Sequence, residues 1–123
     1  MKMKNFYKCE FCGSVVSMLN DSGVKLNCCG HPMTVMAPNS VDAAAEKHVP
    51  VATRDGNKLT VNVGSAPHPM AAEHRIEWIM AAQDKRTQRV VLDAGADPAA
   101  EFILDDGPVT VYGYCNIHGL WQA

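Results

Sequence analysis

Short apolar runs separated by turn residues occupy most of the chain, and this pattern limits the folds that it can adopt. We expect strands at residues 49–53, 58–63, 74–80, 89–92, 101–104 and 109–114. Turn signals such as Asp55-Gly56-Asn57 and Asp105-Asp106-Gly107 lie between these runs, and no long amphipathic helical pattern interrupts them. Strands at this spacing predict an antiparallel β-sandwich or a β-barrel.

Alternation within two of the runs predicts which side chains share a face of the sheet. In the third run one face would carry His74, Ile76, Trp78 and Met80. In the last run one face would carry Val109, Val111, Gly113 and Cys115. Taken singly, His74 and Cys115 could be ordinary core residues, because free cysteine is often buried and a histidine on an apolar face is usually hydrogen-bonded filler.

A smaller unit is expected at the N-terminus, where the first four cysteines lie. Residues 14–19 and 24–27, joined by the turn at 20–23, predict a β-hairpin with cysteines at both ends. Cys9 and Cys12 form a Cys-x-x-Cys knuckle, which lets two thiolates converge on one metal. Cys28 and Cys29 are adjacent, so both can bind that metal only if the backbone turns sharply, as Gly30 would allow.

Metal ligation is the favoured interpretation of these cysteines. The chain has five cysteines, an odd number, and its basic N-terminus lacks the apolar segment of a signal peptide, so we expect it in the reducing cytoplasm. A unit this small also cannot bury enough apolar surface by itself. The alternatives are a disulfide pair, or buried thiols with one reactive cysteine. We expect His31 to be an ordinary turn histidine before Pro32, because four sulfurs already complete a site.

Composition excludes some classes of partner. With 47% hydrophobic and 20% charged residues the chain is typical of a globular protein, and its net charge of −2 gives no general basic field for nucleic acid or an anionic membrane. No run approaches the roughly 20 apolar residues of a membrane span. Small residues and turn formers at 37–45 predict a linker, with a helical turn at 41–45.

A second cluster of candidate ligands belongs to the larger unit. Cys115 and His118 form a Cys-x-x-His turn where an apolar run ends, and three further histidines of this unit are His48, His68 and His74. Structural zinc is normally closed by four ligands, so one thiolate with four imidazoles suits a redox metal with a vacant position better. We interpret this set as a non-haem iron site.

Three segments of the chain carry a resemblance to a known family. They are Glu46-Lys47-His48-Val49-Pro50, His68-Pro69-Met70-Ala71-Ala72-Glu73-His74-Arg75-Ile76-Glu77-Trp78-Ile79 and Cys115-Asn116-Ile117-His118-Gly119-Leu120-Trp121. Together with the Cys-x-x-Cys and Cys-Cys elements they resemble desulfoferrodoxin, the two-iron type of superoxide reductase. The resemblance implies a mainly β protein, with a desulforedoxin-like domain at 1–37 and a catalytic immunoglobulin-like β-sandwich at 38–123.

The resemblance also assigns the site residues. It implies that the equatorial ligands of a catalytic iron are His48, His68, His74 and His118. It implies that Cys115 is the axial ligand, with the sixth position open in the ferrous state. A second, rubredoxin-like iron would be held by Cys9, Cys12, Cys28 and Cys29. Glu46 matches a carboxylate that can occupy the open position of the ferric iron, and Lys47 matches a solvent-facing cation near it. Outside this family both would be taken for a solvated charged loop.

The implied activity is the one-electron reduction of superoxide to hydrogen peroxide, with the iron re-reduced by an external donor such as rubredoxin. A homodimer is also implied. Three other functions stay open on the sequence: a non-catalytic metal-binding module such as a zinc ribbon on a β-sandwich, a pure electron carrier, and a superoxide dismutase. The four-cysteine iron could relay electrons or be structural, since tetrahedral thiolate sites serve both purposes.

Overall fold

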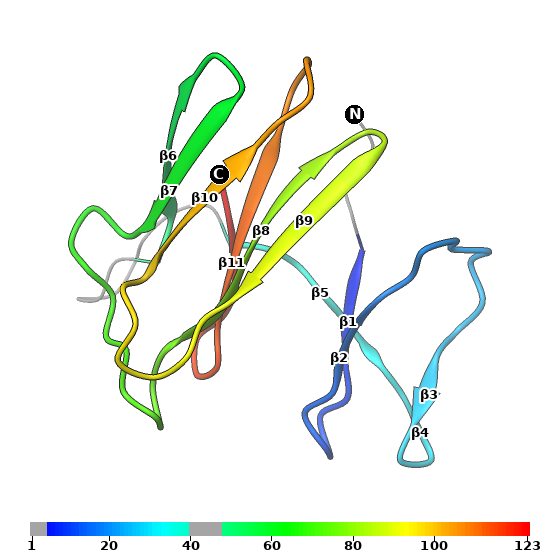
Figure 1. The fold of residues 1–123 in the computed structure, drawn as a ribbon. Helices are drawn as coiled ribbons and strands as arrows, with labels where there is room; N and C mark the ends of the chain where they lie inside the picture. Colours follow the sequence, from blue (N-terminus) through cyan, green and yellow to red (C-terminus); the bar gives the residue numbers. More distant parts are fainter. Residues whose placement is uncertain (1–4, 40–47) are drawn as a thin grey trace. The chain divides into compact units, whose positions relative to one another are not determined.

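The structure, a computed structural model, describes residues 5–39 and 48–123 and is built from strands joined by turns and loops (Figure 1). The chain forms two compact units, residues 2–37 and residues 38–123. The expected helical turn at 41–45 falls outside the described residues. Among the residues that are described, no helix is long and apolar enough to cross a membrane.

The larger unit contains two antiparallel sheets. The first has three strands in the order β10-β7-β6. Its strands are β6 (Pro50–Asp55), β7 (Lys58–Val63) and β10 (Ala99–Ile103). The second has four strands in the order β12-β11-β8-β9. Its strands are β8 (Ile76–Gln83), β9 (Arg86–Val91), β11 (Thr110–Cys115) and β12 (Gly119–Gln122).

The apolar core lies between these sheets. On β7 the alternate residues Leu59, Val61 and Val63 are buried, as the alternation predicts. They belong to one cluster with Ile76, Ile79, Ala81, Val111 and Cys115 of the second sheet. Gly113 brings β11 close to the first sheet, since a Cβ there would lie 3.5 Å from Cγ2 of Val63. The predicted antiparallel β-sandwich is therefore confirmed, and the barrel alternative is wrong.

One strand begins earlier than predicted, and another was not predicted at all. β9 begins at Arg86 rather than at residue 89, because Asp84 and Lys85 form the turn of a tight hairpin with β8. The strand β12 was not expected, because it is short and directly follows the Cys-x-x-His turn. Asn39 bridges to Trp121 of β12 in a parallel sense, and the Asn39 N–H donates to the Leu120 carbonyl at 2.9 Å.

A β-bulge corrects the predicted face of the third run. In the pairing of β11 with β8, Tyr114 lies opposite Trp78 whereas Cys115 lies opposite Ile76, so Glu77 is the extra residue. Ile76 and Ile79 both enter the core as a result, and Trp78 instead stacks on Tyr114 on the other face. The prediction that His74, Ile76, Trp78 and Met80 share one face is wrong, and His74 precedes the strand.

The smaller unit has a three-stranded sheet in the order β2-β1-β5, and a separate short hairpin. The sheet contains β1 (Phe6–Lys8), β2 (Val15–Ser17) and β5 (Thr34–Met36). The hairpin pairs β3 (Asn27–Cys28) with β4 (His31–Pro32).

The predicted hairpin between residues 14–19 and 24–27 is wrong. β2 pairs with β1, and β3 pairs with β4. The turn residue Asp21 explains the difference, because its carboxylate accepts the Gly23 N–H at 2.9 Å and the Tyr7 hydroxyl at 2.9 Å. These bonds hold the turn against β1 instead of closing a two-stranded ladder.

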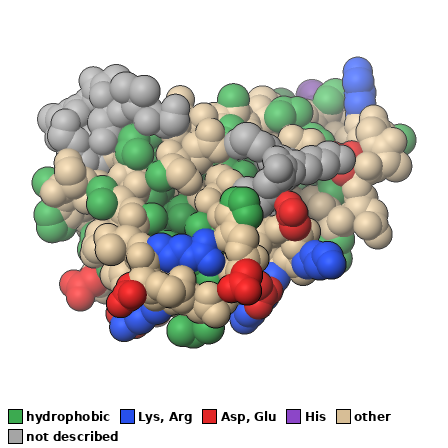
Figure 2. All heavy atoms as spheres, turned by 90° about the horizontal axis from the view of Figure 1, so that it is seen from above, with side chains coloured by type: hydrophobic (Ala, Val, Ile, Leu, Met, Phe, Trp, Pro, Cys, Tyr) green, Lys and Arg blue, Asp and Glu red, His purple; other side chains and the backbone are tan. Residues whose placement is uncertain are grey.

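Charged side chains of both signs are interspersed on the face seen in Figure 2. This distribution agrees with the small net charge of −2. Two exposed ion pairs, Lys58–Glu101 at 3.6 Å and Arg86–Asp105 at 3.4 Å, belong to the larger unit. Exposed pairs of this kind contribute little to stability, so the fold depends on the core between the sheets.

Candidate metal centres

The four cysteines of the smaller unit converge. The sulfurs of Cys9, Cys12, Cys28 and Cys29 all lie within 4.8 Å of one another, and every cysteine is free. The Cys12 sulfur lies 3.6 Å from that of Cys28, and the Cys28 sulfur lies 4.0 Å from that of Cys29. Metal–sulfur bonds of about 2.3 Å in a tetrahedron separate sulfurs by about 3.8 Å. The geometry therefore fits a four-thiolate metal site and not a disulfide.

The turn after Cys28 allows two adjacent cysteines to point toward the same site. Cys29 has φ 53° and Gly30 has φ 74°, so both central residues of the β3–β4 hairpin are left-handed. Consecutive left-handed residues are typical of the tight hairpin turn that reverses the chain within two residues. Cys29 is the one non-glycine residue with positive φ among those described. The predicted sharp turn at Cys28-Cys29-Gly30 is confirmed.

Hydrogen bonds shift the pKa values of three of these thiols in opposite directions. The side chain of Ser14, followed by its backbone, lowers the pKa of Cys12 to about 6. Hydrogen bonding with Cys12 and then Cys9 raises the pKa of Cys28 to about 12, and that of Cys29 moves in the same direction. A negative charge on Cys12 thus disfavours one on Cys28 and Cys29, and a metal cation among these sulfurs favours their thiolate forms.

His31 lies outside this cluster of sulfurs. Its exposed ring stacks on the ring of Phe11, with centroids 4.1 Å apart and planes at 17°. The expectation that His31 is not a ligand agrees with this placement. The Cys12 N–H donates to the Cys9 sulfur at 3.4 Å, which is the N–H to sulfur contact expected inside a Cys-x-x-Cys knuckle.

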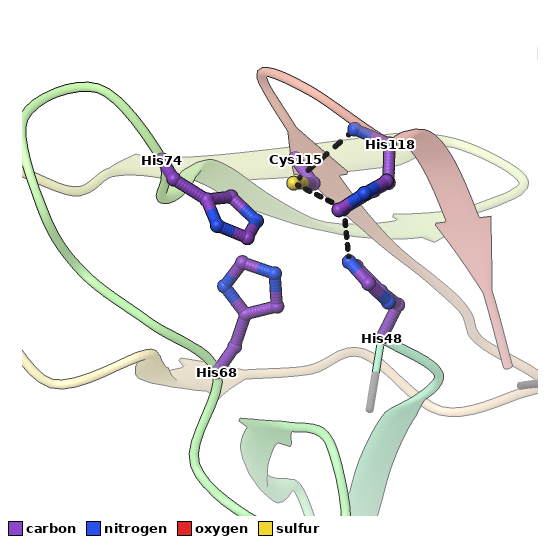
Figure 3. Close-up of side chains that lie close together, drawn as sticks. All are labelled: His48, His68, His74, Cys115 and His118. Atoms are coloured by element: carbon purple, nitrogen blue, oxygen red, sulfur yellow. Dashed lines mark hydrogen bonds between the residues drawn. The ribbon is translucent and has the colours of Figure 1, made fainter. Parts of the chain in front are cut away.

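The second cluster gathers side chains from four separate parts of the larger unit (Figure 3). His48 precedes β6, His68 and His74 lie between β7 and β8, Cys115 ends β11, and His118 lies in the turn to β12. Their ligand atoms all lie within 4.8 Å of one another. Cys115 faces the core cluster by alternation with Val111 on β11, and the bulge at Glu77 of β8 places Ile76 opposite it.

The four imidazoles follow one another in a closed ring. Centroids are 4.6 Å apart for His48 and His68, 4.9 Å for His68 and His74, 5.1 Å for His74 and His118, and 4.8 Å for His118 and His48. Neighbouring planes meet at 64–86°. Nε2 of His48 lies 3.1 Å from Nδ1 of His118. Metal–nitrogen bonds of about 2.1 Å put adjacent nitrogens about 3.0 Å apart, so this spacing fits a shared ion.

The histidine tautomers also favour a metal between the four imidazoles. Nδ1 of His68 lies 2.7 Å from the Pro69 carbonyl, which can only accept, so Nδ1 carries the proton and Nε2 keeps its lone pair. Nε2 of His74 is buried and has no hydrogen-bond partner among the described residues. A buried imidazole nitrogen without a partner is costly unless something else binds it. The donor set therefore fits a metal ion.

Cys115 is fully buried, and its sulfur accepts the His118 N–H at 3.4 Å. Nδ1 of His118 lies 3.8 Å from the same sulfur. His48 and His68 are also buried, whereas His118 is exposed. The cluster thus has an inner side at the sulfur and a solvent side at His118.

Sequence reasoning missed two supporting residues. Trp121 stacks on His48 with centroids 4.6 Å apart and planes at 16°, and its Nε1–H donates to the His118 carbonyl at 3.2 Å. Asn116 bonds to the backbone on both sides of His74. Both stand within the Cys115–Trp121 segment, so their nearness to two ligands in sequence is the signal that could have marked them. Glu46 and Lys47, expected beside the open position, lie outside the described residues.

Comparisons with known proteins agree over the whole chain. The family model described as "Desulfoferrodoxin" matches residues 40–123, and "Desulfoferrodoxin, N-terminal domain" matches residues 2–36. A desulfoferrodoxin homolog of Archaeoglobus fulgidus is 46% identical over 95% of this chain and 94% of its own length. A superoxide reductase of Pyrococcus horikoshii is 36% identical over 68% of this chain and 89% of its own length.

A solved structure extends the likeness to the fold. The crystal structure of the superoxide reductase from Treponema pallidum matches with a TM-score of 0.82 and 29% identity, and the match covers 98% of both chains. Both units of this chain are therefore included in the structural match. The family model of the larger unit alone spans more than half of the chain. This chain belongs to the desulfoferrodoxin family.

Proposed function

We propose that this chain is a superoxide reductase, which converts superoxide, one electron and two protons into hydrogen peroxide. The observation that carries the proposal is the set of five ligand atoms, four imidazole nitrogens and one thiolate sulfur, within 4.8 Å of one another. Six-coordinate ions have one position more than this set fills. A structural zinc site is closed, and an electron carrier needs no vacancy, whereas a small anionic substrate needs one.

The ligands have distinct roles in this proposal. The imidazoles of His48, His68, His74 and His118 and the buried thiolate of Cys115 would together hold a non-haem iron. When bound, ferrous iron supplies the electron that superoxide receives. The His118 N–H donates to the Cys115 sulfur and so holds it in position as a ligand. Substrate would reach the site from solvent, to which His118 is exposed.

Charge favours an anionic substrate at this site. One thiolate and four neutral imidazoles carry a charge of −1, so a divalent ion leaves the centre with a charge of +1. Lys47 adds a cation before the first histidine ligand and attracts superoxide in a salt-dependent way. Glu46 would supply a carboxylate ligand to the oxidised ion.

The four cysteines of the smaller unit hold a second, rubredoxin-like iron. Residues 1–37 then act as the desulforedoxin-like domain, and residues 38–123 act as the catalytic domain. An external donor such as rubredoxin re-reduces the catalytic iron, and the protein works in the cytoplasm. The matches to both family models and the convergent sulfurs support this division of roles.

A homodimer completes the proposal. The smaller unit exposes large apolar side chains, among them Leu19 at 95%, Phe11 at 66% and Val24 at 64%. Apolar side chains of this size on so small a unit favour contact with a second copy. Light scattering of the intact chain during size-exclusion chromatography measures the mass, and a single mass of 13.3 kDa would contradict the dimer.

The decisive experiment mixes the iron-loaded, reduced chain with superoxide and counts hydrogen peroxide, oxygen and electrons consumed. A reductase makes one peroxide per superoxide, consumes one electron and releases no oxygen. A dismutase releases oxygen and needs no reductant. An electron carrier or a binding module leaves superoxide unchanged although both sites hold iron. Oxygen release without a reductant, or superoxide left unchanged, would overturn the proposal. The control is Cys115→Ser loaded with iron in the same way.

A further inference from the structure

The loop that carries His74 needs an external support, because His74 lies outside any strand. β8 begins at Ile76, and the segment before it is a tight turn in which the Ala71 N–H donates to the His74 carbonyl at 3.0 Å. The His74 N–H donates back to the Ala71 carbonyl at 3.3 Å. These bonds shape the turn but join it to no other ligand. Figure 3 shows His74 on this loop, apart from the strand end that carries Cys115 and His118.

Asn116 provides that connection through three hydrogen bonds. Its Nδ2 donates to the Glu73 carbonyl at 2.9 Å, and its Oδ1 accepts the Arg75 N–H at 2.9 Å. Its own backbone N–H donates to the Arg75 carbonyl at 3.2 Å. One planar amide thus bonds to the backbone on both sides of His74.

We propose that Asn116 is a positioning residue that fixes His74 relative to Cys115 and His118. Asn116 directly follows Cys115 and stands two residues before His118, so the same short turn that carries two ligands also holds the loop of a third. Nε2 of His74 therefore stays aimed at the centre of the ring even though its own loop is not part of a sheet. This inference rests on the proposed iron ligands.

The chemistry of the side chain is specific to asparagine. Bridging a carbonyl and an N–H requires one donor and one acceptor on the same short side chain, which the carboxamide supplies. Aspartate keeps the acceptor for the Arg75 N–H but places an oxygen against the Glu73 carbonyl. Alanine removes both side-chain bonds and leaves the backbone bond in place.

A matched control exists at the other end of β8. Nε2 of Gln83 donates to the Asp105 carbonyl at 2.7 Å, and its Oε1 accepts the Asp105 N–H at 3.0 Å. This amide makes the same kind of bridge to a loop, but Asp105 is not next to any ligand of the cluster. Gln83→Ala and Gln83→Glu therefore measure the cost of losing such a bridge without moving His74.

The test measures ferrous iron affinity by chelator competition, the visible absorption of the oxidised protein, and the thermal midpoint. We expect Asn116→Ala to weaken iron binding at the histidine site about 10-fold to 100-fold, the usual effect of removing a group that orients a ligand. Asn116→Asp should lie between wild type and Asn116→Ala. The four-cysteine iron of the same chain should bind as in wild type, and Gln83→Ala should lower the thermal midpoint without changing iron affinity.

Wild-type iron affinity and an unchanged spectrum in folded Asn116→Ala would overturn the proposal. Equal iron loss in Asn116→Ala and Gln83→Ala would also overturn it, since the effect would then be general destabilisation. If Asn116→Ala fails to fold, the same iron affinity and spectrum are measured on Asn116→Asp. This variant keeps the hydrogen bond from the Arg75 N–H. A wild-type chain that binds iron only at the four cysteines would instead refute the proposed function.

Discussion

His118 makes four contacts within the cluster. Its Nδ1 lies between His48 and the Cys115 sulfur, its N–H donates to that sulfur, and its carbonyl accepts from Trp121. The ring and the backbone of His118 are thus fixed independently of each other. The side chain of an exposed ligand can rotate more freely than that of a buried one. The two backbone hydrogen bonds of His118 limit this motion.

Trp121 should stabilise the larger unit through both its ring and its N–H. Trp121→Phe keeps a ring over His48 but removes the bond to the His118 carbonyl, so we expect a loss of about 1 kcal/mol in unfolding free energy. Trp121→Ala removes both and should cost about 3–5 kcal/mol. Denaturant unfolding of the iron-loaded chain measures both values. Equal losses in the two variants would show that the stacked ring contributes nothing.

The proposed role of Lys47 is electrostatic steering. Lys47→Ala should slow the second-order reaction with superoxide about tenfold at low ionic strength and flatten its salt dependence. Lys47→Arg keeps the charge and should retain most of the rate. Stopped-flow rates between low and high salt measure the effect, and an unchanged low-salt rate in Lys47→Ala would refute steering.

At the scale of elements, the sequence predicted periodic features well and irregular ones poorly. Leu59, Val61 and Val63 alternate, so the position of β7 was predictable. The bulge at Glu77 leaves no trace in a period-two pattern, because it depends on how β11 pairs with β8. The pairing of β2 with β1 was missed for a related reason, since the bond between Asp21 and Tyr7 joins residues far apart in the chain.

The candidate ligands themselves could be named from residue type and order. Their convergence could not be derived, because His48, His74 and Cys115 come from segments that only the folded sandwich brings together. The roles of Trp121 and Asn116 could not be predicted, because their hydrogen bonds go to backbone carbonyl and N–H groups, which nearly every residue has.

The β3–β4 turn allows a prediction about metal retention. Gly30 has φ 74° and open space at its Cβ position, so Gly30→Ala costs conformational strain alone, about 1 kcal/mol. We expect about fivefold weaker metal binding by the four cysteines, measured by chelator competition. Gly56→Ala, at φ 59° in the β6–β7 hairpin, is the matched control. It should destabilise the larger unit without affecting this metal, and equal effects of the two variants would contradict the prediction.

The two units of the molecule are stabilised in different ways. In the described part of the smaller unit, Phe6 and Cys9 are the buried apolar residues, whereas the larger unit has a cluster that joins both sheets. A unit with so little core depends on its metal, because binding free energy then acts as folding free energy. Metal removal should therefore affect the two units unequally.

We expect chelation of the four-cysteine metal to unfold residues 5–37 while the sandwich keeps its structure. Cys28→Ser should do the same without chelator, since it removes one of the four sulfurs and leaves the histidine cluster intact. Amide hydrogen exchange, read segment by segment, measures this directly: protection should disappear in β1 and β5 and persist in β7 and β8. A metal-free chain that still protects β1 and β5 would show that the smaller unit folds by its own contacts. In that case the four-cysteine metal would have a role in electron transfer and none in stabilising the fold.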